Sequence, residues 1–244
     1  MLTTVAAQTA QDGVVKVIHI KGDARYMSAG NTTWLPLKIG AVLKPGSVIQ
    51  TAVGSHVDLV LNNPNATVAS GSGVRQVMYF QPKAQHDAIR IFESSVLGIE
   101  KLSVTHTGVE TITETELDLK AGRIFGSVKK MSEGSKYEVK IPNGVAGIRG
   151  TFYFLSAEAI FRILSGSGVL SYVRENDEAE VHVVPAGSEC DGRTGRVTPI
   201  PPTILDELNR LAQELRKGQD APVSLLTIDY TLFYLSPTTT QSRN

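Results

Sequence analysis

The 244-residue sequence lacks the features that mark disulfide-bonded, membrane-spanning and nucleic-acid-binding proteins. Cys190 is the only cysteine, which excludes an intrachain disulfide and a cysteine-rich metal site. We expect a buried or incidental thiol there rather than a reactive one. No apolar run approaches the roughly 18 residues of a membrane span. The 24 basic residues are balanced by 24 acidic ones, so nucleic acid is not an expected partner.

The motifs of catalysis and metal binding are also missing. The histidines lie on unrelated segments without H-x-x-x-H or H-E-x-x-H spacing; they are His19, His56, His86, His106 and His182. His56 and Asp58 would share one face of a strand, a possible start for a metal site, but the sequence offers no third ligand. No G-x-S-x-G nucleophile elbow occurs. We therefore predict no catalytic residue, no metal, no cofactor and no enzymatic activity.

Short extended segments dominate what is present. Residues 111–119 alternate polar and apolar side chains, which is typical of a strand with one solvated face. On that face Glu114, Glu116 and Asp118 form a row that we interpret as solvated rather than as glycosidase carboxylates. Further strands are expected at 14–20, 57–61, 88–92, 99–105, 123–129, 136–141, 151–155, 159–164, 168–174 and 180–184. About a dozen short strands with almost no helix predict an all-β fold.

Two segments share the frame L-x-L-K-x-G followed by apolar residues, at 35–43 and 117–125. Their glycines, Gly40 and Gly122, are expected where a strand turns a corner and then resumes. Repeated units of strand, glycine corner and strand favour an irregular β-solenoid or rolled β-sandwich. A conventional two-sheet sandwich is the competing architecture.

One amphipathic helix is expected at about 203–217, followed by Gly218 as a stop. Its apolar face consists of Ile204, Leu205, Leu208, Leu211, Ala212 and Leu215. This face must be buried. We expect it to dock on an open end or edge of the β-stack and cap it; a partner-binding helix is the alternative. One or two strands at 223–235 and a disordered tail from Pro237 should follow.

The glycine-rich segment 141–151 holds Pro142, Gly144, Gly147, Arg149, Gly150 and Thr151. Strands rather than a helix follow it, so we predict a tight β-corner and not a phosphate-binding loop. Arg149 is expected to be buried and to bond loop carbonyls or an acidic side chain. Trp34, the only tryptophan, is expected in core or corner packing; contact with a sugar or partner is the alternative.

Four segments resemble FecR-domain proteins. Residues 142–151 are similar to the family's P-x-x-V-A-G-[VI]-R-G-T element, and 34–51 to its W-x-P-L-x-x-G opening. Residues 117–125 resemble its L-x-L-x-x-G-x-[IV] line, and 164–169 its closing V-x-x-G-x-V. The resemblance implies a β-domain of a bacterial sensor family. Its founding member is a membrane regulator that passes an iron-siderophore signal to a sigma factor.

The expected organisation has three parts. Residues 1–12 are interpreted as a trimmed secretory signal, because Val5 and Ala7 are small residues at signal-peptidase positions; a plain flexible terminus is the alternative. Residues 13–195 form the FecR-like domain with an insert at about 64–116, and residues 196–244 carry the helix, a strand and the tail. We expect a periplasmic or secreted, non-enzymatic recognition or sensor module that binds a protein or an envelope glycan. A self-associating envelope scaffold is the alternative, and a polysaccharide-acting enzyme is less favoured.

Overall fold

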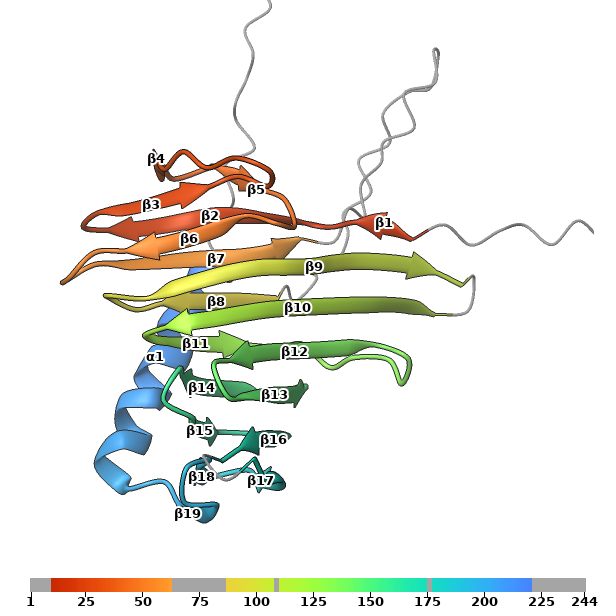
Figure 1. Cartoon of the computed structure of the whole chain (residues 1–244), viewed down its shortest axis with the longest axis vertical. Helices are drawn as coiled ribbons and strands as arrows, with labels where there is room; N and C mark the ends of the chain where they lie inside the picture. The colour runs from red at the N-terminus through yellow and green to blue at the C-terminus, as the bar shows by residue number, and fades with distance from the viewer. Residues whose placement is uncertain (1–9, 63–86, 108–109, 175–176, 221–244) are drawn as a thin grey trace, which may run out of the picture.

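The protein is an all-β molecule whose described residues contain one helix, near the C-terminus, as the sequence predicts. A computed structural model describes residues 10–62, 87–107, 110–174 and 177–220 (Figure 1). These residues form nineteen strands, more than the dozen expected. The excess comes partly from two-residue strands at sheet margins, such as β4 (Leu35–Pro36) and β5 (Val42–Leu43).

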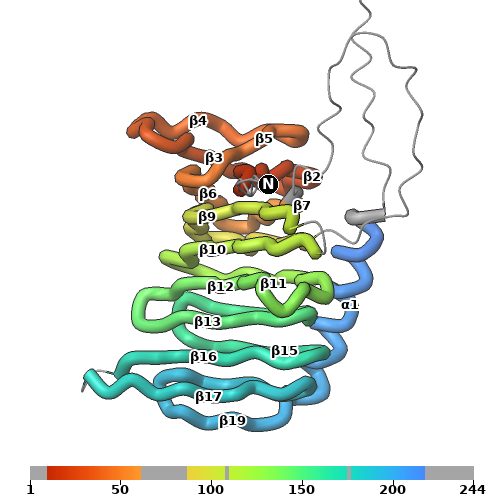
Figure 2. Tube along the Cα trace, turned by 90° about the vertical axis from the view of Figure 1, so that its right-hand side faces the viewer, coloured from red at the N-terminus to blue at the C-terminus, as the bar shows by residue number. Residues whose placement is uncertain are grey.

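The strands form two sheets that face each other (Figure 2). The ten-stranded sheet has the order β17 (Ala179–Pro185), β16 (Ser167–Val173), β13 (Gly144–Arg149), β12 (Lys136–Ile141), β10 (Thr111–Ala121), β9 (Val96–His106), β6 (Val48–Thr51), β3 (Ala24–Met27) and β4, with β1 (Gln11–Asp12) paired to β9. The nine-stranded sheet has the order β19 (Arg196–Pro199), β18 (Ser188–Asp191), β15 (Ile160–Ile163), β14 (Phe152–Ser156), β11 (Arg123–Ser127), β8 (Asp87–Ile91), β7 (His56–Asn62), β2 (Val14–Lys21) and β5.

The chain passes repeatedly from one sheet to the other, which makes the molecule a rolled sandwich. Gly40 and Gly122 lie at two of these crossings with φ of +85° and +79°, so the predicted glycine corners are confirmed. Strand β11, in the nine-stranded sheet, connects β10 to β12, and these two strands pair in parallel. This single coil has the geometry of a β-solenoid. The other strand pairs of the described residues are antiparallel.

The main core lies between the two sheets. Alternate residues of every long strand point into it, and Tyr153, Phe161 and Ile49 are among its largest fully buried side chains. Cys190 is also fully buried there, as predicted, and burial raises the pKa of its thiol to about 11. A thiol with so high a pKa carries little nucleophilic thiolate.

Helix α1 (Pro202–Asp220) contains the predicted 203–217. The helix docks on the β-stack, as predicted, but on a sheet face and not on an open end or edge. It packs against the outer face of the nine-stranded sheet and runs across several strands (Figures 1 and 2). The physical reason is a second apolar layer, because Phe125, Phe152 and Phe154 point outward from this sheet and need cover. All six apolar residues of the predicted helix face pack against this layer.

Strands β8 and β9 and the first half of β10 fall within the expected insert at about 64–116, and they occupy the middle of the two sheets. The three-part organisation of the chain stays a prediction. Residues 64–86 of the insert, residues 1–9 of the expected 1–12 signal remnant, and the expected strands at 223–235 with the tail after them lie outside the described residues. Within the described residues, no helix is both long and apolar enough to span a membrane.

Candidate functional site

The glycine-rich segment is a strand and not a corner over most of its length. Gly144 and Gly147 lie within β13, and only Gly150, with φ of +63°, makes the turn into β14. Gly144 is required for another reason, since a Cβ there would lie 2.4 Å from the carbonyl oxygen of Ser171 on β16. The tight corner predicted for the whole segment is thus wrong for its first half. Pro142 is exposed in the turn before β13, and Thr151 is buried after Gly150.

Arg149 is exposed, so the prediction of a buried guanidinium is wrong. The reason is the strand alternation: Ala146 and Ile148 point into the core, and Arg149 points the other way. Its Nη2 donates a hydrogen bond to the carbonyl oxygen of Ser132 at 3.1 Å. The expected contact with a loop carbonyl is therefore present, but at the surface.

Trp34 is half-buried, and the guanidinium of Arg25 lies 4.7 Å from its ring centroid. Arg25 also donates from Nε to Oε1 of Gln50 at 2.8 Å. One face of the tryptophan ring is therefore already covered by a cation. This arrangement favours the packing interpretation of Trp34 over ligand contact.

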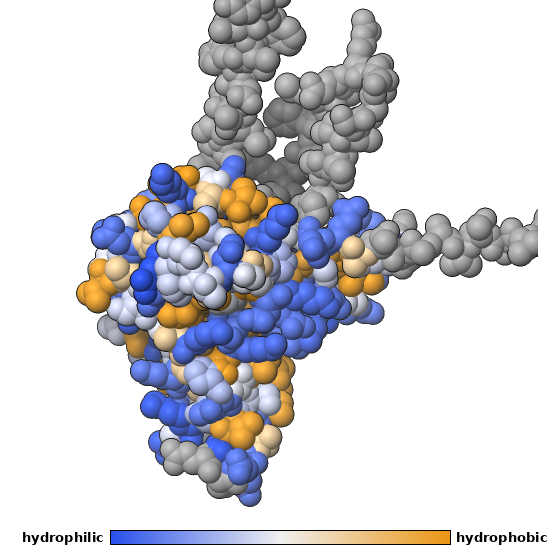
Figure 3. Space-filling view, turned by 45° about the horizontal axis from the view of Figure 1, so that its top comes forward, coloured by the Kyte–Doolittle hydropathy of each residue, from blue (hydrophilic) through white to orange (hydrophobic). Residues whose placement is uncertain are grey.

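The carboxylate row on β10 lies on the outer face of the ten-stranded sheet among lysines. Glu116 pairs with Lys136 and Lys140 at 3.6 Å each, and Lys136 also pairs with Glu138 at 2.9 Å. Hydrophilic side chains gather in a broad band across this part of the surface (Figure 3). The row is a ladder of exposed ion pairs, which supports its interpretation as a solvated strand face.

The outer face of the nine-stranded sheet carries a different row, built by cross-strand register. Consecutive partners along it are His19, Asp58, Arg90, Phe125, Phe154, Arg162 and Glu189, one from each of seven neighbouring strands. Helix α1 packs over the middle of the row. At one end the side chain of His19 is 52% exposed, and at the other the side chains of Arg162 and Glu189 are largely buried.

Beside this row lies a groove where several strand corners meet, and we call it the corner groove. Its volume is about 520 Å³, and it is lined by Val53, Glu93, Ser94, Gly122, Arg123, Phe154, Ser156, Glu158, Ile160 and Arg162. These residues come from four corners that are far apart in the sequence and from the adjoining strands β11, β14 and β15. A smaller space of about 170 Å³ shares Arg123, Phe154 and Arg162 and reaches under the first turns of α1.

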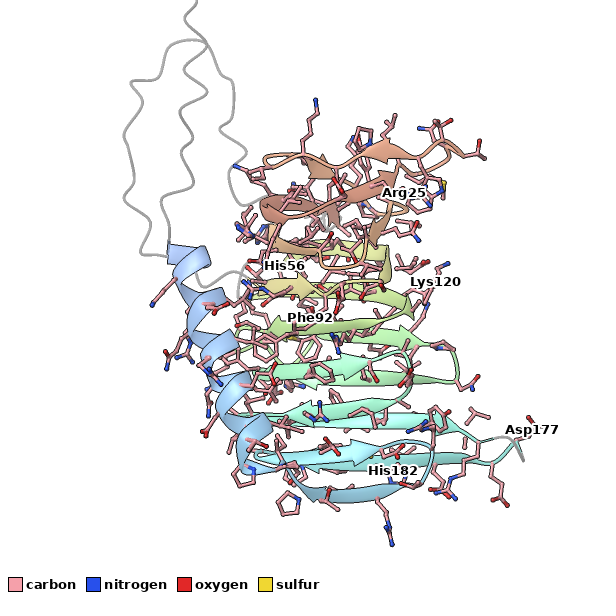
Figure 4. The ribbon with its side chains drawn as sticks, turned by 90° about the vertical axis from the view of Figure 1, so that its left-hand side faces the viewer. Arg25, His56, Phe92, Lys120, Asp177 and His182 are labelled. Atoms are coloured by element: carbon pink, nitrogen blue, oxygen red, sulfur yellow. The ribbon has the colours of Figure 1, made fainter. Side chains whose placement is uncertain are left out.

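Two arginines that line this groove cover aromatic rings. The guanidinium of Arg123 lies 5.4 Å from the ring centroid of Phe92, and that of Arg162 lies 4.8 Å from the ring centroid of Phe154. The two rings are themselves in contact, with centroids 6.3 Å apart. Figure 4 places Phe92 beside α1, at the level of the middle strands. The result is a platform of stacked guanidinium and aromatic planes.

Carboxylates hold this platform in place. Arg123 Nη2 lies 3.3 Å from Oε1 of Glu93, whose other oxygen accepts a 2.7 Å hydrogen bond from the backbone N–H of Gly54. Arg162 Nε donates to Glu189 on the neighbouring strand. Glu158 adds a further acidic group to the lining. Planar cationic groups, apolar rings and carboxylates suit the binding of a polar ligand or a peptide.

Sequence reasoning missed the corner groove because its residues are scattered through the chain. The sequence did contain one signal, the run Phe152-Tyr153-Phe154, which places aromatic side chains on both faces of one strand. A strand with large apolar residues on both faces has both faces covered. That inference would have predicted that the outer face of this strand is covered, as the helix covers it.

Comparisons with known proteins add little to this description. No family model and no curated protein matches the sequence. Two solved structures of a "putative anti-sigma factor" from Parabacteroides distasonis ATCC 8503 align at 12% and 11% identity, with TM-scores of 0.34 and 0.33. Each alignment covers 47% of this chain and 50% of the other, so the match spans half of those proteins. At this level of similarity the alignments carry no argument about fold or function.

Proposed function

We propose that this chain is a non-enzymatic recognition or sensor module of the FecR type that binds a protein or glycan partner in the corner groove. The observation that carries the proposal is the pair of guanidinium groups, Arg123 and Arg162, stacked on Phe92 and Phe154 around a space of about 520 Å³. The FecR-like motifs support the sensor role. Export to the periplasm or cell envelope belongs to the same proposal and rests on that resemblance and on Val5 and Ala7.

Binding can be tested with a charge reversal and a matched control. Arg123 has a side chain that is 50% exposed and lies 3.3 Å from Glu93; Arg193 is 56% exposed and lies 3.3 Å from Asp191, in the turn between β18 and β19. Both arginines thus have the same kind of surface ion pair, but only Arg123 lines the groove. We expect Arg123→Glu to abolish capture of a partner from cell-envelope extracts or on a glycan array, and Arg193→Glu to retain it. Equal retention by both variants would contradict the proposal.

The enzymatic alternative has its own readout. Glu93 and Glu158 are the carboxylates of the corner groove, and a glycosidase would need two such groups. Envelope polysaccharides incubated with the purified chain should release no new reducing ends if the module only binds. Release that is lost in Glu158→Gln would replace the proposed function with hydrolysis.

A scaffold role is the second candidate, and one feature of the sheet edge favours it. Strand β17 ends the ten-stranded sheet and exposes Val181 and Val183, each 66% accessible. The opposite edge is the two-residue strand β4, which contains Pro36 and is poorly suited to pairing. Sedimentation analysis of wild type and Val183→Lys tests this role. A wild-type oligomer that the lysine disperses would support the scaffold over the sensor.

A further inference from the structure

The structure supplies the third ligand that the sequence did not offer beside His56 and Asp58. His19 on β2 is the cross-strand partner of Asp58 on β7, and His56 lies two residues before Asp58 on the same face. A register shift between Val17 and His19 sets this alignment. One potential ligand atom from each of the three side chains lies within 4.8 Å of the others. The histidine rings stack with centroids 5.2 Å apart.

Asp58 is held rigidly in the orientation that a ligand needs. Its Oδ1 and Oδ2 accept hydrogen bonds from Nε and Nη2 of Arg90 at 2.7 Å and 2.9 Å. A carboxylate has about four lone-pair sites, so this fork leaves one on each oxygen. Oδ2 also lies 3.9 Å from Nδ1 of His19. Hydrogen-bonded support of a ligating carboxylate is what well-formed metal sites show behind their ligands.

The positive charge of Arg90 does not stand alone at this site. Its Nη1 donates to Oε2 of Glu214 on α1 at 2.7 Å, so Asp58 and Glu214 together surround the guanidinium with two negative charges. Burial and the nearby guanidinium lower the pKa of His56, which favours its neutral ring. A neutral imidazole is the form that coordinates metal.

The site is accessible from solvent. The His19 side chain is 52% exposed, and rotation of its ring can close the ligand triangle around an ion. Figure 4 shows His56 on the side of the molecule that carries α1, level with the C-terminal end of the helix. An ion here would keep an open position for water or for a group from a partner.

We propose that His19, His56 and Asp58 form a binding site for one divalent transition-metal ion, of the class of Zn²⁺. Two imidazoles and one carboxylate are a donor set that suits Zn²⁺, Ni²⁺ or Cu²⁺ and not Mg²⁺ or Ca²⁺. None of these three residues lines the corner groove, so the site does not depend on the proposed function.

Calorimetric titration of ZnCl₂ into the untagged, chelator-treated full chain tests the site. We expect saturable binding of one ion per chain, weakened at least tenfold in both His19→Ala and His56→Ala. His106→Ala is the matched control, because His106 is exposed on β9 of the other sheet and bonds only to Thr111 in the described structure. That variant should titrate like wild type.

Thermal unfolding provides a second readout that does not require the variants to bind. Zn²⁺ should raise the melting temperature of wild type and His106→Ala but not of His19→Ala, since a ligand that binds only the folded state stabilises it. His19 is surface-exposed, so its alanine variant should fold. Absence of saturable binding in wild type would overturn the proposal. Binding that survives both histidine substitutions would place the metal elsewhere and overturn it equally.

Discussion

Ser95 occupies the space directly in front of Gly122. A Cβ on Gly122 would lie 2.6 Å from the Cα of Ser95 and 2.1 Å from its Oγ. The same Ser95 Oγ accepts a hydrogen bond from the backbone N–H of Arg123 at 3.0 Å. The two corners thus interlock, and Arg123 of the corner groove is positioned by this contact.

The interlocked corner predicts different costs for two glycine substitutions. Gly122→Ala should combine left-handed backbone strain of about 1–2 kcal/mol with overpacking of about 1–3 kcal/mol. Gly40 has a similar φ of +85°, but a Cβ there meets no atom within 4 Å. Gly40→Ala should therefore lose only the strain of about 1–2 kcal/mol. Urea unfolding measures both, and equal losses would show that Ser95 moves freely out of the way.

The buried charge on β8 gives a second prediction. Arg90→Ala would leave Asp58 buried without its cation and should cost about 3–5 kcal/mol of unfolding free energy. Glu214 is 58% exposed, so Glu214→Ala should cost at most about 1 kcal/mol. Denaturant unfolding with circular-dichroism detection checks both values. If the two variants lose the same small amount, water replaces Arg90 around the Asp58 carboxylate.

Local sequence patterns predicted many of the strands, two of the corners and the helix. Alternation in 111–119 identified β10 and its solvated face, the shared L-x-L-K-x-G frame identified the corners at Gly40 and Gly122, and the 3.6-residue period identified α1. Each of these is a short-range pattern that the backbone geometry of one element imposes.

Pairing between distant strands could not be read in the same way. The row from His19 through Arg90 to Arg162 exists only because seven strands align in one register. A shift of one residue in any strand would send its side chain to the opposite face. This is why His19 was not recognised as a partner of Asp58, and why the corner groove was not foreseen.

Arg149 shows how a local interpretation can fail. An arginine among Val145, Ala146 and Ile148 suggested burial, but the alternation of side chains along β13 points Arg149 to solvent. Its bond to the Ser132 carbonyl is exposed. Arg149→Ala should therefore cost about 0.5–1 kcal/mol, the value of a single hydrogen bond, and not the roughly 3–5 kcal/mol expected for an unpaired buried charge. A loss above about 3 kcal/mol in urea unfolding would restore the buried interpretation.

Asp87 yields a prediction about pH. This residue begins β8, is nearly fully buried, and accepts a 2.8 Å hydrogen bond at Oδ1 from the backbone N–H of Lys129. Burial raises its carboxyl pKa from 3.8 to about 6, although the Lys129 N–H acts in the opposite direction. Between these two pKa values the folded chain keeps a proton that the unfolded chain has lost. Its contribution to stability must therefore fall as the pH rises through this window, and then stay constant above about 6.

Asp87→Asn removes this titration and keeps an oxygen for the Lys129 N–H. The difference between 3.8 and about 6 corresponds to about 3 kcal/mol at most. Relative to wild type, the variant should therefore gain up to that amount at pH 7 and nothing at pH 3, where both chains are neutral at this position. Asp12→Asn, on exposed β1, should show no such pH-dependent difference and serves as the control. Unfolding free energies measured from pH 3 to 7 decide the question. A difference between Asp87→Asn and wild type that stays the same at every pH would mean that folding leaves the pKa of Asp87 unchanged, because the hydrogen bond from Lys129 offsets burial.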